Sequence, residues 1–252
     1  MTFPESLADE IAHRIARGFE DRAAVLGWVV ETCDLTELGV EDEAHTSNLD
    51  DVDPVVRAKL AAAIDDAFRK RETEIASWPE TTDCDRLSGV FASLSRDGIV
   101  AFDEAHEDMA LAIERAENAG QARVVAGGSP ARGYTFYRAD DVWRALKGDG
   151  LFVCFGSFEE DEPAKQPKPA PCTECQGRGW IAPKSAGEFA AMCSCKKHPP
   201  PPLAKPLTRA QMIGEAVVTA CRASGLAVEW DGSATSVKLP SFRWQRRGPR
   251  ST

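Results

Sequence analysis

The stretch PCTECQGRGW opens the part of this chain that most constrains its structure, because four cysteines follow within 24 residues. The first two form a C-x2-C pair, and the last two form a C-x-C pair after 17 intervening residues. Four thiolates in two closely spaced pairs fit a tetrahedral Zn²⁺ site. We therefore predict a structural zinc ion bound by Cys172, Cys175, Cys193 and Cys195, with His198 as a reserve ligand.

The composition around the cysteines indicates an insertion. The stretches EEDEPAKQPKPAP before the first pair and KKHPPPPLAKP after the second are rich in proline and charge, as extended linkers are. Few apolar side chains other than Trp180 and Phe189 lie between them, so zinc binding would supply most of the folding free energy of the segment. A zinc ion with four sulfur ligands has no open position for water, which favours a structural role over a catalytic one.

The sequence matches two enzyme motifs in part, but each match is incomplete. PCTEC matches half of the zinc-deaminase signature, yet the H-x-E half is missing because Glu107 follows His106 directly. IVAFDEAHEDM resembles a Walker B box ending in Asp103 and Glu104, but the chain has no G-x-x-x-x-G-K-[ST] phosphate loop. We therefore interpret Asp103 as a helix N-cap and Glu104 and Glu107 as acids of the first helical turn.

Length and composition indicate a soluble globular protein. A chain of 252 residues with 43% apolar residues can bury a proper core in one large or two small domains. No apolar run approaches the roughly 20 residues of a membrane-spanning helix, and the start of the sequence lacks a signal-peptide pattern. We expect a cytoplasmic protein without membrane contact, whose eight cysteines are thiols or metal ligands. Outside the four-cysteine segment, the predicted core or unreactive thiols are Cys33, Cys84, Cys154 and Cys221.

The first part of the chain is predicted to be helical. An apolar residue recurs every four positions from Leu7 to Ile15, and residues 24–30 form a second apolar segment. Asp53 and Pro54 are typical of an N-cap and a first turn, and they open a third, long helix.

From residue 81 onward, helices alternate with strands. The stretch TDCDRLSGVFASLSRDG is an amphipathic helix closed by Gly98, and the strand IVAF follows it. Near the end of the sequence, a helix closed by Gly225 precedes a predicted hairpin of LAVEW and SVKL. Because each of these two helices leads through a glycine into a strand, we expect both to pack on one face of a shared sheet.

These patterns predict an α+β fold, with a mixed sheet and amphipathic helices on one of its faces. The predicted segments are an all-helical N-terminal segment at 1–78, a first part of the α+β domain at 79–158, Pro-rich linkers at 159–205 that carry the zinc-knuckle insertion at 172–198, and a second part of the domain with a basic tail at 206–252.

The runs WPETTDCDRLSGVFASLSRDGIVA, GYTFYRADD, LFVCFGSF and GLAVEWDGSATSVKL resemble a bacterial domain-of-unknown-function family, over about residues 78–158 and 206–247. The resemblance implies a compact, cytoplasmic α+β domain and brings no established activity. The chain departs from the family pattern by having FDEAHEDM where many members carry a cysteine cluster, and by its long cysteine insertion. The C-x2-C-x-G-x-G half of the insertion resembles one repeat of the cysteine-rich domain of Hsp40 chaperones, and the whole is similar to zinc knuckles of replication and helicase-loading proteins.

Charge is distributed unevenly along the chain. Residues 172–252 hold 12 Lys/Arg against 5 Asp/Glu, whereas residues 1–171 hold 18 against 35. The possible nucleic-acid contacts are Arg243, Trp244, Arg246 and Arg247, with arginines on phosphates and the tryptophan stacked on a base. In the alternative interpretation, the tryptophan packs inward while the arginines face solvent or pair with the acidic N-terminal region.

The sequence therefore predicts a non-catalytic, zinc-binding interaction module that contacts a protein or a nucleic acid. The alternative is a hydrolase-like enzyme whose carboxylate-lined pocket lies between the helical segment and the sheet. Neither the partner nor the oligomeric state follows from the sequence.

Overall fold

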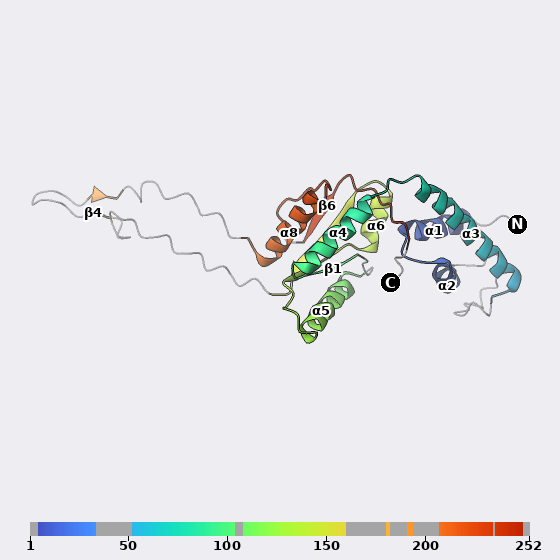
Figure 1. Cartoon of the computed structure of the whole chain (residues 1–252), viewed down its shortest axis with the longest axis horizontal. Helices are drawn as coiled ribbons and strands as arrows, with labels where there is room; N and C mark the ends of the chain where they lie inside the picture. Colours follow the sequence, from blue (N-terminus) through green and yellow to red (C-terminus); the bar gives the residue numbers. More distant parts are fainter. Residues whose placement is uncertain are drawn as a thin grey trace, which may run out of the picture. The chain divides into compact units, whose positions relative to one another are not determined.

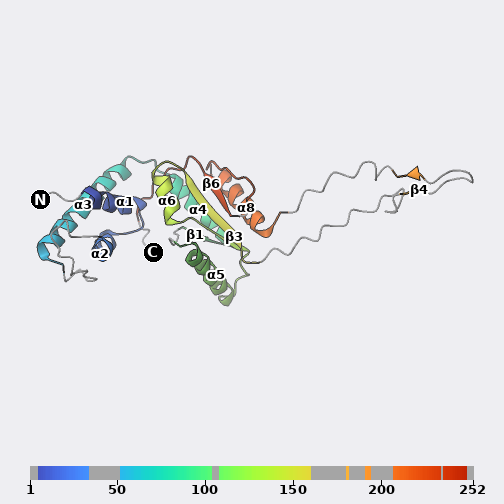
Figure 2. The same cartoon turned by 180° about the vertical axis from the view of Figure 1, so that it is seen from behind.

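A computed structural model gives the fold of the protein (Figures 1 and 2). It describes residues 5–33, 52–103, 108–159, 180–181, 191–193, 207–233 and 235–248, with the backbone alone at 180–181 and 191–192. The chain divides into two compact units. One combines Met1–Glu159 with Arg209–Thr252, and the other is Glu160–Thr208. Within the described residues, no helix has both the length and the apolar character needed to cross a bilayer.

The predicted N-terminal helices are present as α1 (Glu5–Arg17), α2 (Arg22–Thr32) and α3 (Pro54–Ala76). Asp53 caps α3 as expected, because its carboxylate accepts hydrogen bonds from the backbone N–H groups of Val55 and Val56 at 2.7 and 3.2 Å. The apolar stripes of the three helices form a core of their own, which includes Leu7, Ile11, Ile15, Val25, Val29, Leu60 and Ile64.

The remainder of this unit is built on a four-stranded mixed sheet in the order β1-β2-β3-β6. Its strands are β1 (Ile99–Phe102), β2 (Gly133–Phe136), β3 (Leu151–Ser157) and β6 (Ser236–Leu239). β1 and β2 run parallel, with Ile99 opposite Gly133, whereas β3 is antiparallel to both β2 and β6. The predicted α+β class is confirmed.

Helices cover the two faces of the sheet unequally. α4 (Asp83–Arg96) and α8 (Arg209–Ala223) pack against each other and against one face, as predicted. The other face is covered by α5 (Met109–Val125) at β1 and β2, where Ala112 contacts Phe136 and Cys154. The short helix α6 (Ala139–Leu146) joins β2 to β3. Figure 1 shows α4 in front of the strands, and Figure 2 shows β3 in front of α4.

Two local expectations were wrong. Asp103 does not cap α5; Asp108 does, accepting hydrogen bonds from the backbone N–H groups of Ala110 and Leu111. The run LAVEW makes a single bridge from Glu229 to Lys238 in place of a full strand.

Gly133 sets how closely β2, β3 and α8 approach one another. A Cβ atom at this position would lie 2.9 Å from Cγ1 of Ile213 on α8 and closer still to the carbonyl oxygen of Gly156 on β3. Gly89, on α4, provides the opposite case, because no atom lies within 4 Å of its would-be Cβ.

We predict that Gly133→Ala lowers the free energy of unfolding by about 3 kcal/mol, because backbone and helix must separate to admit the methyl group. Gly89→Ala, at an exposed position inside a helix, should raise it by about 0.5–1 kcal/mol. Urea titrations of both variants measure these changes, and an unchanged midpoint for Gly133→Ala would contradict the packing described here.

Candidate functional site

The cysteine segment lies within the compact unit Glu160–Thr208. The described part of this unit contains two short antiparallel strands, β4 (Trp180–Ile181) and β5 (Ala191–Met192), with Trp180 opposite Met192. Cys193 follows β5 directly and is buried. The other predicted ligands, Cys172, Cys175 and Cys195, and the reserve ligand His198, lie outside the described residues. Elsewhere in the described chain, no group of three His, Cys, Asp or Glu residues is placed to hold a metal ion.

The four cysteines predicted to be core thiols have properties that differ from those of a metal ligand. Burial is the largest cause that raises the pKa of each thiol, to about 12 for Cys33, Cys84 and Cys221 and to about 11 for Cys154. Thiols with such pKa values stay protonated at neutral pH, and only the thiolate is a good nucleophile or zinc ligand.

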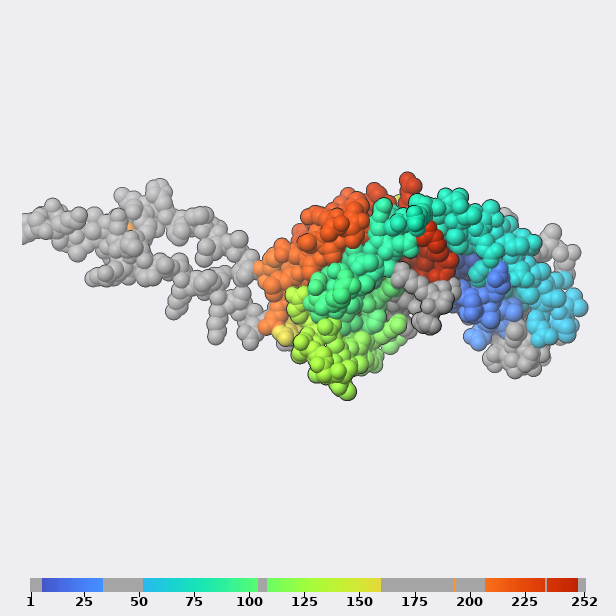
Figure 3. Space-filling model, in the orientation of Figure 1, coloured from blue at the N-terminus to red at the C-terminus, as the bar shows by residue number. Residues whose placement is uncertain are grey.

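Residues 240–248, which we call the arginine segment, lead from β6 to the N-terminal helices (Figure 3, red between blue and green). Trp244 is only 6% exposed, and its indole N–H donates to the carbonyl oxygen of Arg17 at 3.1 Å. Its ring lies 5.5 Å from the ring of Tyr137 and 5.9 Å from that of Phe19. This is the inward packing of the alternative interpretation. In this conformation the tryptophan offers no free ring face to a base.

Arg246 occupies a partly buried polar cluster at the carboxyl ends of β1 and β2. Its guanidinium lies 3.3 Å from Asp103 Oδ1, and the same carboxylate accepts hydrogen bonds from Tyr137 Oη at 3.0 Å and Ser88 Oγ at 2.9 Å. Burial, followed by the charge of Asp103, raises the pKa of Tyr137 well above its ordinary value. Tyr137 therefore keeps its proton, and the ion pair of Arg246 with Asp103 joins the arginine segment to the sheet.

The two other arginines of the segment differ in their contacts. Arg247 donates to Asp85 Oδ2 at 2.6 Å and to the carbonyl oxygens of Pro79 and Glu80. Burial raises the pKa of Asp85, but hydrogen bonds from Thr82 and Arg247 outweigh it and lower the pKa overall. The side chain of Arg243 is exposed, and its backbone N–H donates to Asp83 Oδ2 at 3.0 Å.

Sequence reasoning missed the cluster of Asp103, Tyr137 and Arg246. The useful signal was that Asp103 and Tyr137 each follow an apolar strand directly. Only the parallel pairing of β1 with β2 brings those two strand ends together, and the sequence did not reveal that pairing.

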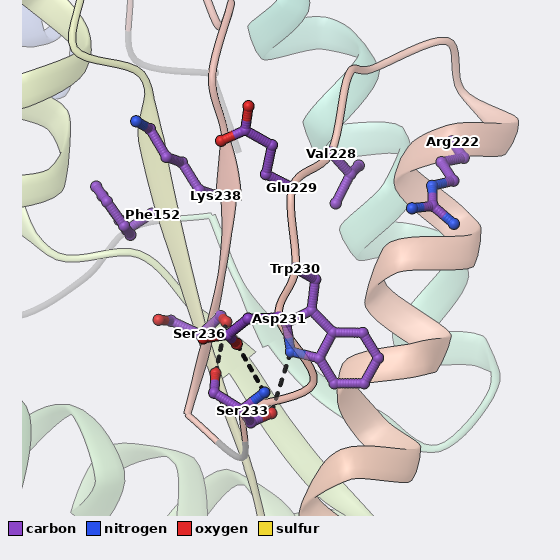
Figure 4. A pocket seen from close by; sticks show the side chains of 9 residues that line it. All are labelled: Phe152, Arg222, Val228, Glu229, Trp230, Asp231, Ser233, Ser236 and Lys238. Atoms are coloured by element: carbon purple, nitrogen blue, oxygen red, sulfur yellow. Dashed lines mark hydrogen bonds between the residues drawn. The ribbon is translucent and has the colours of Figure 1, made fainter.

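The described residues form several cavities of small-molecule size, and two of them have volumes near 600 Å³. One, of about 620 Å³, lies between α1, α2 and α6 and is lined in part by Asp9, Glu10 and Asp140. Its wall contains no residue of the sheet, so it differs in position from the pocket expected for an enzyme between the helical segment and the sheet. The other, of about 590 Å³, lies at the β6 edge, with Trp230 on one side and Phe152 and Lys238 on the other (Figure 4).

Within the first cavity, His13 packs edge-on against Trp143, with ring centroids 3.6 Å apart. Burial lowers the pKa of His13 from its ordinary value of 6.5, and the charges of Lys147 and Arg17 lower it further, while Asp9 opposes them. The fold therefore favours the neutral imidazole at pH 7.

We predict that Trp244→Ala lowers the free energy of unfolding by about 3–5 kcal/mol, because it empties a site at the centre of the core. Arg243→Ala, on the same segment, should change it by less than about 0.5 kcal/mol because the side chain is exposed. Guanidinium unfolding curves compare the two, and similar midpoints would refute the inward position of Trp244.

The lowered pKa of His13 predicts a pH-dependent stability. The unfolded chain binds the proton more tightly, so stability is complete above pH 6.5 and falls as the pH drops from 6.5 toward the lower folded pKa. His13→Gln should remove this part of the loss. Unfolding free energies at pH 7.5 and 5.5 provide the check, and equal losses in the wild type and the variant would exclude the effect.

Comparison with known proteins places the whole fold in one family. The family model described as Domain of unknown function (DUF6891) matches residues 3–172 and 203–248. The match includes the N-terminal helices, so it begins earlier than the resemblance at about residue 78. Residues 173–202, which hold three of the four clustered cysteines, lie outside it. No curated protein and no solved structure matches the chain. Because the family match covers most of the chain, the protein belongs to the DUF6891 family.

Proposed function

We propose that the protein is a non-catalytic interaction module, in which a zinc-bound hairpin is attached to a DUF6891 domain. The proposed zinc ligands are the four cysteines predicted from the sequence, Cys172, Cys175, Cys193 and Cys195. A closed set of four thiolates would fix the fold of the hairpin without supplying a reactive metal position.

The pairing of β4 with β5 is the observation that carries this proposal. β4 follows the C-x2-C pair along the chain, and β5 ends at Met192, directly before the C-x-C pair. In an antiparallel hairpin, the start of the first strand and the end of the second strand lie side by side. The C-x2-C pair precedes the first strand and the C-x-C pair follows the second, so a hairpin would bring the two pairs together. Cys193, directly after β5, is buried, which agrees with a thiolate enclosed by a metal site.

A role in binding, and not in the stability of the DUF6891 domain, is supported by the position of the hairpin outside the family match at 173–202. We favour a protein over a nucleic acid as the partner. The residues predicted to contact a nucleic acid were Arg243, Trp244, Arg246 and Arg247. The side chains of the last three are engaged within the chain, whereas that of Arg243 is exposed.

We predict one zinc ion per chain in the purified protein and none in Cys172→Ser/Cys175→Ser. Because the hairpin folds as a separate unit, this variant should keep the main unfolding transition of the wild type. The matched control is Cys33→Ser, which alters the thiol at the C-cap of α2 and should keep the zinc. Elemental analysis gives the stoichiometry and calorimetry gives the transition; zinc retained by the double variant would refute the ligand set.

Contact with a partner is tested with the same variants. Affinity isolation from a lysate, with and without nuclease, should recover a protein with the wild type and Cys33→Ser but not with Cys172→Ser/Cys175→Ser. A partner that is lost on nuclease or salt treatment would favour the nucleic-acid alternative. Recovery that is equal for all three proteins would exclude the hairpin as the binding element.

The enzyme remains a second candidate because the cavity between α1, α2 and α6 has carboxylates in its wall. It predicts that activity depends on Asp9, Glu10 or Asp140 and is unaffected by loss of the cysteines. The two candidates are therefore separated by which set of variants removes function.

A further inference from the structure

The cavity between α1, α2 and α6, which we call the tryptophan cavity, has features that point to a ligand class. Its volume of about 620 Å³ lies within the range of small-molecule sites. Two indole rings face it from different elements, Trp28 on α2 and Trp143 on α6. Trp143 is 40% exposed, which is unusual for so large an apolar side chain.

Both indoles already bind a cation of the chain. The guanidinium carbon of Arg14 lies 4.3 Å from the ring centroid of Trp28, and Nζ of Lys147 lies 3.9 Å from that of Trp143. Both rings thus attract positive charge in this fold, and one face of each is already occupied by a cation of the chain.

The charges of the wall favour a cation as well. Asp9 and Glu10 on α1 and Asp140 on α6 line the cavity, and all three are exposed. Neither Asp9 nor Asp140 forms an ion pair with another residue that the structure describes. Of the two arginines in the wall, Arg14 is paired with Glu20, at 2.5 and 2.6 Å, so Arg17 and the nearby Lys147 stand against three carboxylates.

His13 does not reverse this balance at pH 7, because the fold favours its neutral form. Lys147 and Arg17 provide positive charge near His13, and the negative charge of Asp9 opposes them. The apolar part of the wall, which includes Ala139 and Leu146, would contact the body of a ligand.

We propose that the tryptophan cavity binds a small organic ammonium ion, with its charge among Asp9, Glu10 and Asp140 and its alkyl groups against Trp28 and Trp143. This site is independent of the cysteine hairpin and needs no zinc. An alkylammonium group matches the wall better than a metal ion, since the indoles and Leu146 cannot serve as metal ligands.

Choline and its uncharged carbon analogue 3,3-dimethylbutan-1-ol separate charge from shape in a direct test. Isothermal titration of the full chain with each compound should show choline binding about tenfold or more tightly, as cation–π and carboxylate contacts require. Equal affinities, or tighter binding of butyrate than of choline, would overturn the proposal.

Variants locate the binding. Trp143→Leu and Asp9→Asn/Asp140→Asn should each weaken choline binding by about fivefold to tenfold. The matched controls are Trp78→Leu, which removes an indole that carries Arg71 elsewhere, and Glu114→Gln on α5; both should leave the affinity unchanged. Near-ultraviolet circular dichroism verifies that each variant is folded. Choline affinity that survives Trp143→Leu in a folded protein would also refute the site.

Discussion

The insertion of Trp244 and Arg246 between the N-terminal helices and the sheet is the contact on which the rest of the larger unit depends. Trp244 joins the sheet core to the turn after α1 through Phe19 and the carbonyl oxygen of Arg17. Arg246 can be buried beside it because Asp103 supplies the opposite charge. The cavity between α1 and α6 exists only while these two groups of elements are held together.

Elements defined by neighbouring residues could be predicted from the sequence. Asp53 before α3 and the apolar stripe that ends at Gly98 are local signals, because a cap or a helix face depends on residues within a few positions. The role of Asp103 could not be predicted in this way. Its partners, Tyr137 and Arg246, are 34 and 143 residues away, and only the pairing of β1 with β2 and the path of the arginine segment bring them together.

The two candidate sites also differ in whether neighbouring residues define them. The four cysteines were visible as a pattern because zinc ligands come in closely spaced pairs. The tryptophan cavity was not, since its wall comes from three helices whose contacts are set by packing. A cysteine segment placed after β3 interrupts neither the pairing of β3 with β2 nor that with β6, which explains how the family fold can carry it.

The position of the arginine segment also has a consequence for biosynthesis. The ribosome makes Trp244 and Arg246 more than 160 residues after α3 is complete, at roughly 5–20 residues per second. Until then, a nascent chain lacks the partners that cover Phe19, Tyr137 and the carboxylate of Asp103, so it exposes these groups to solvent. A chain that ends before residue 244 would leave these groups uncovered.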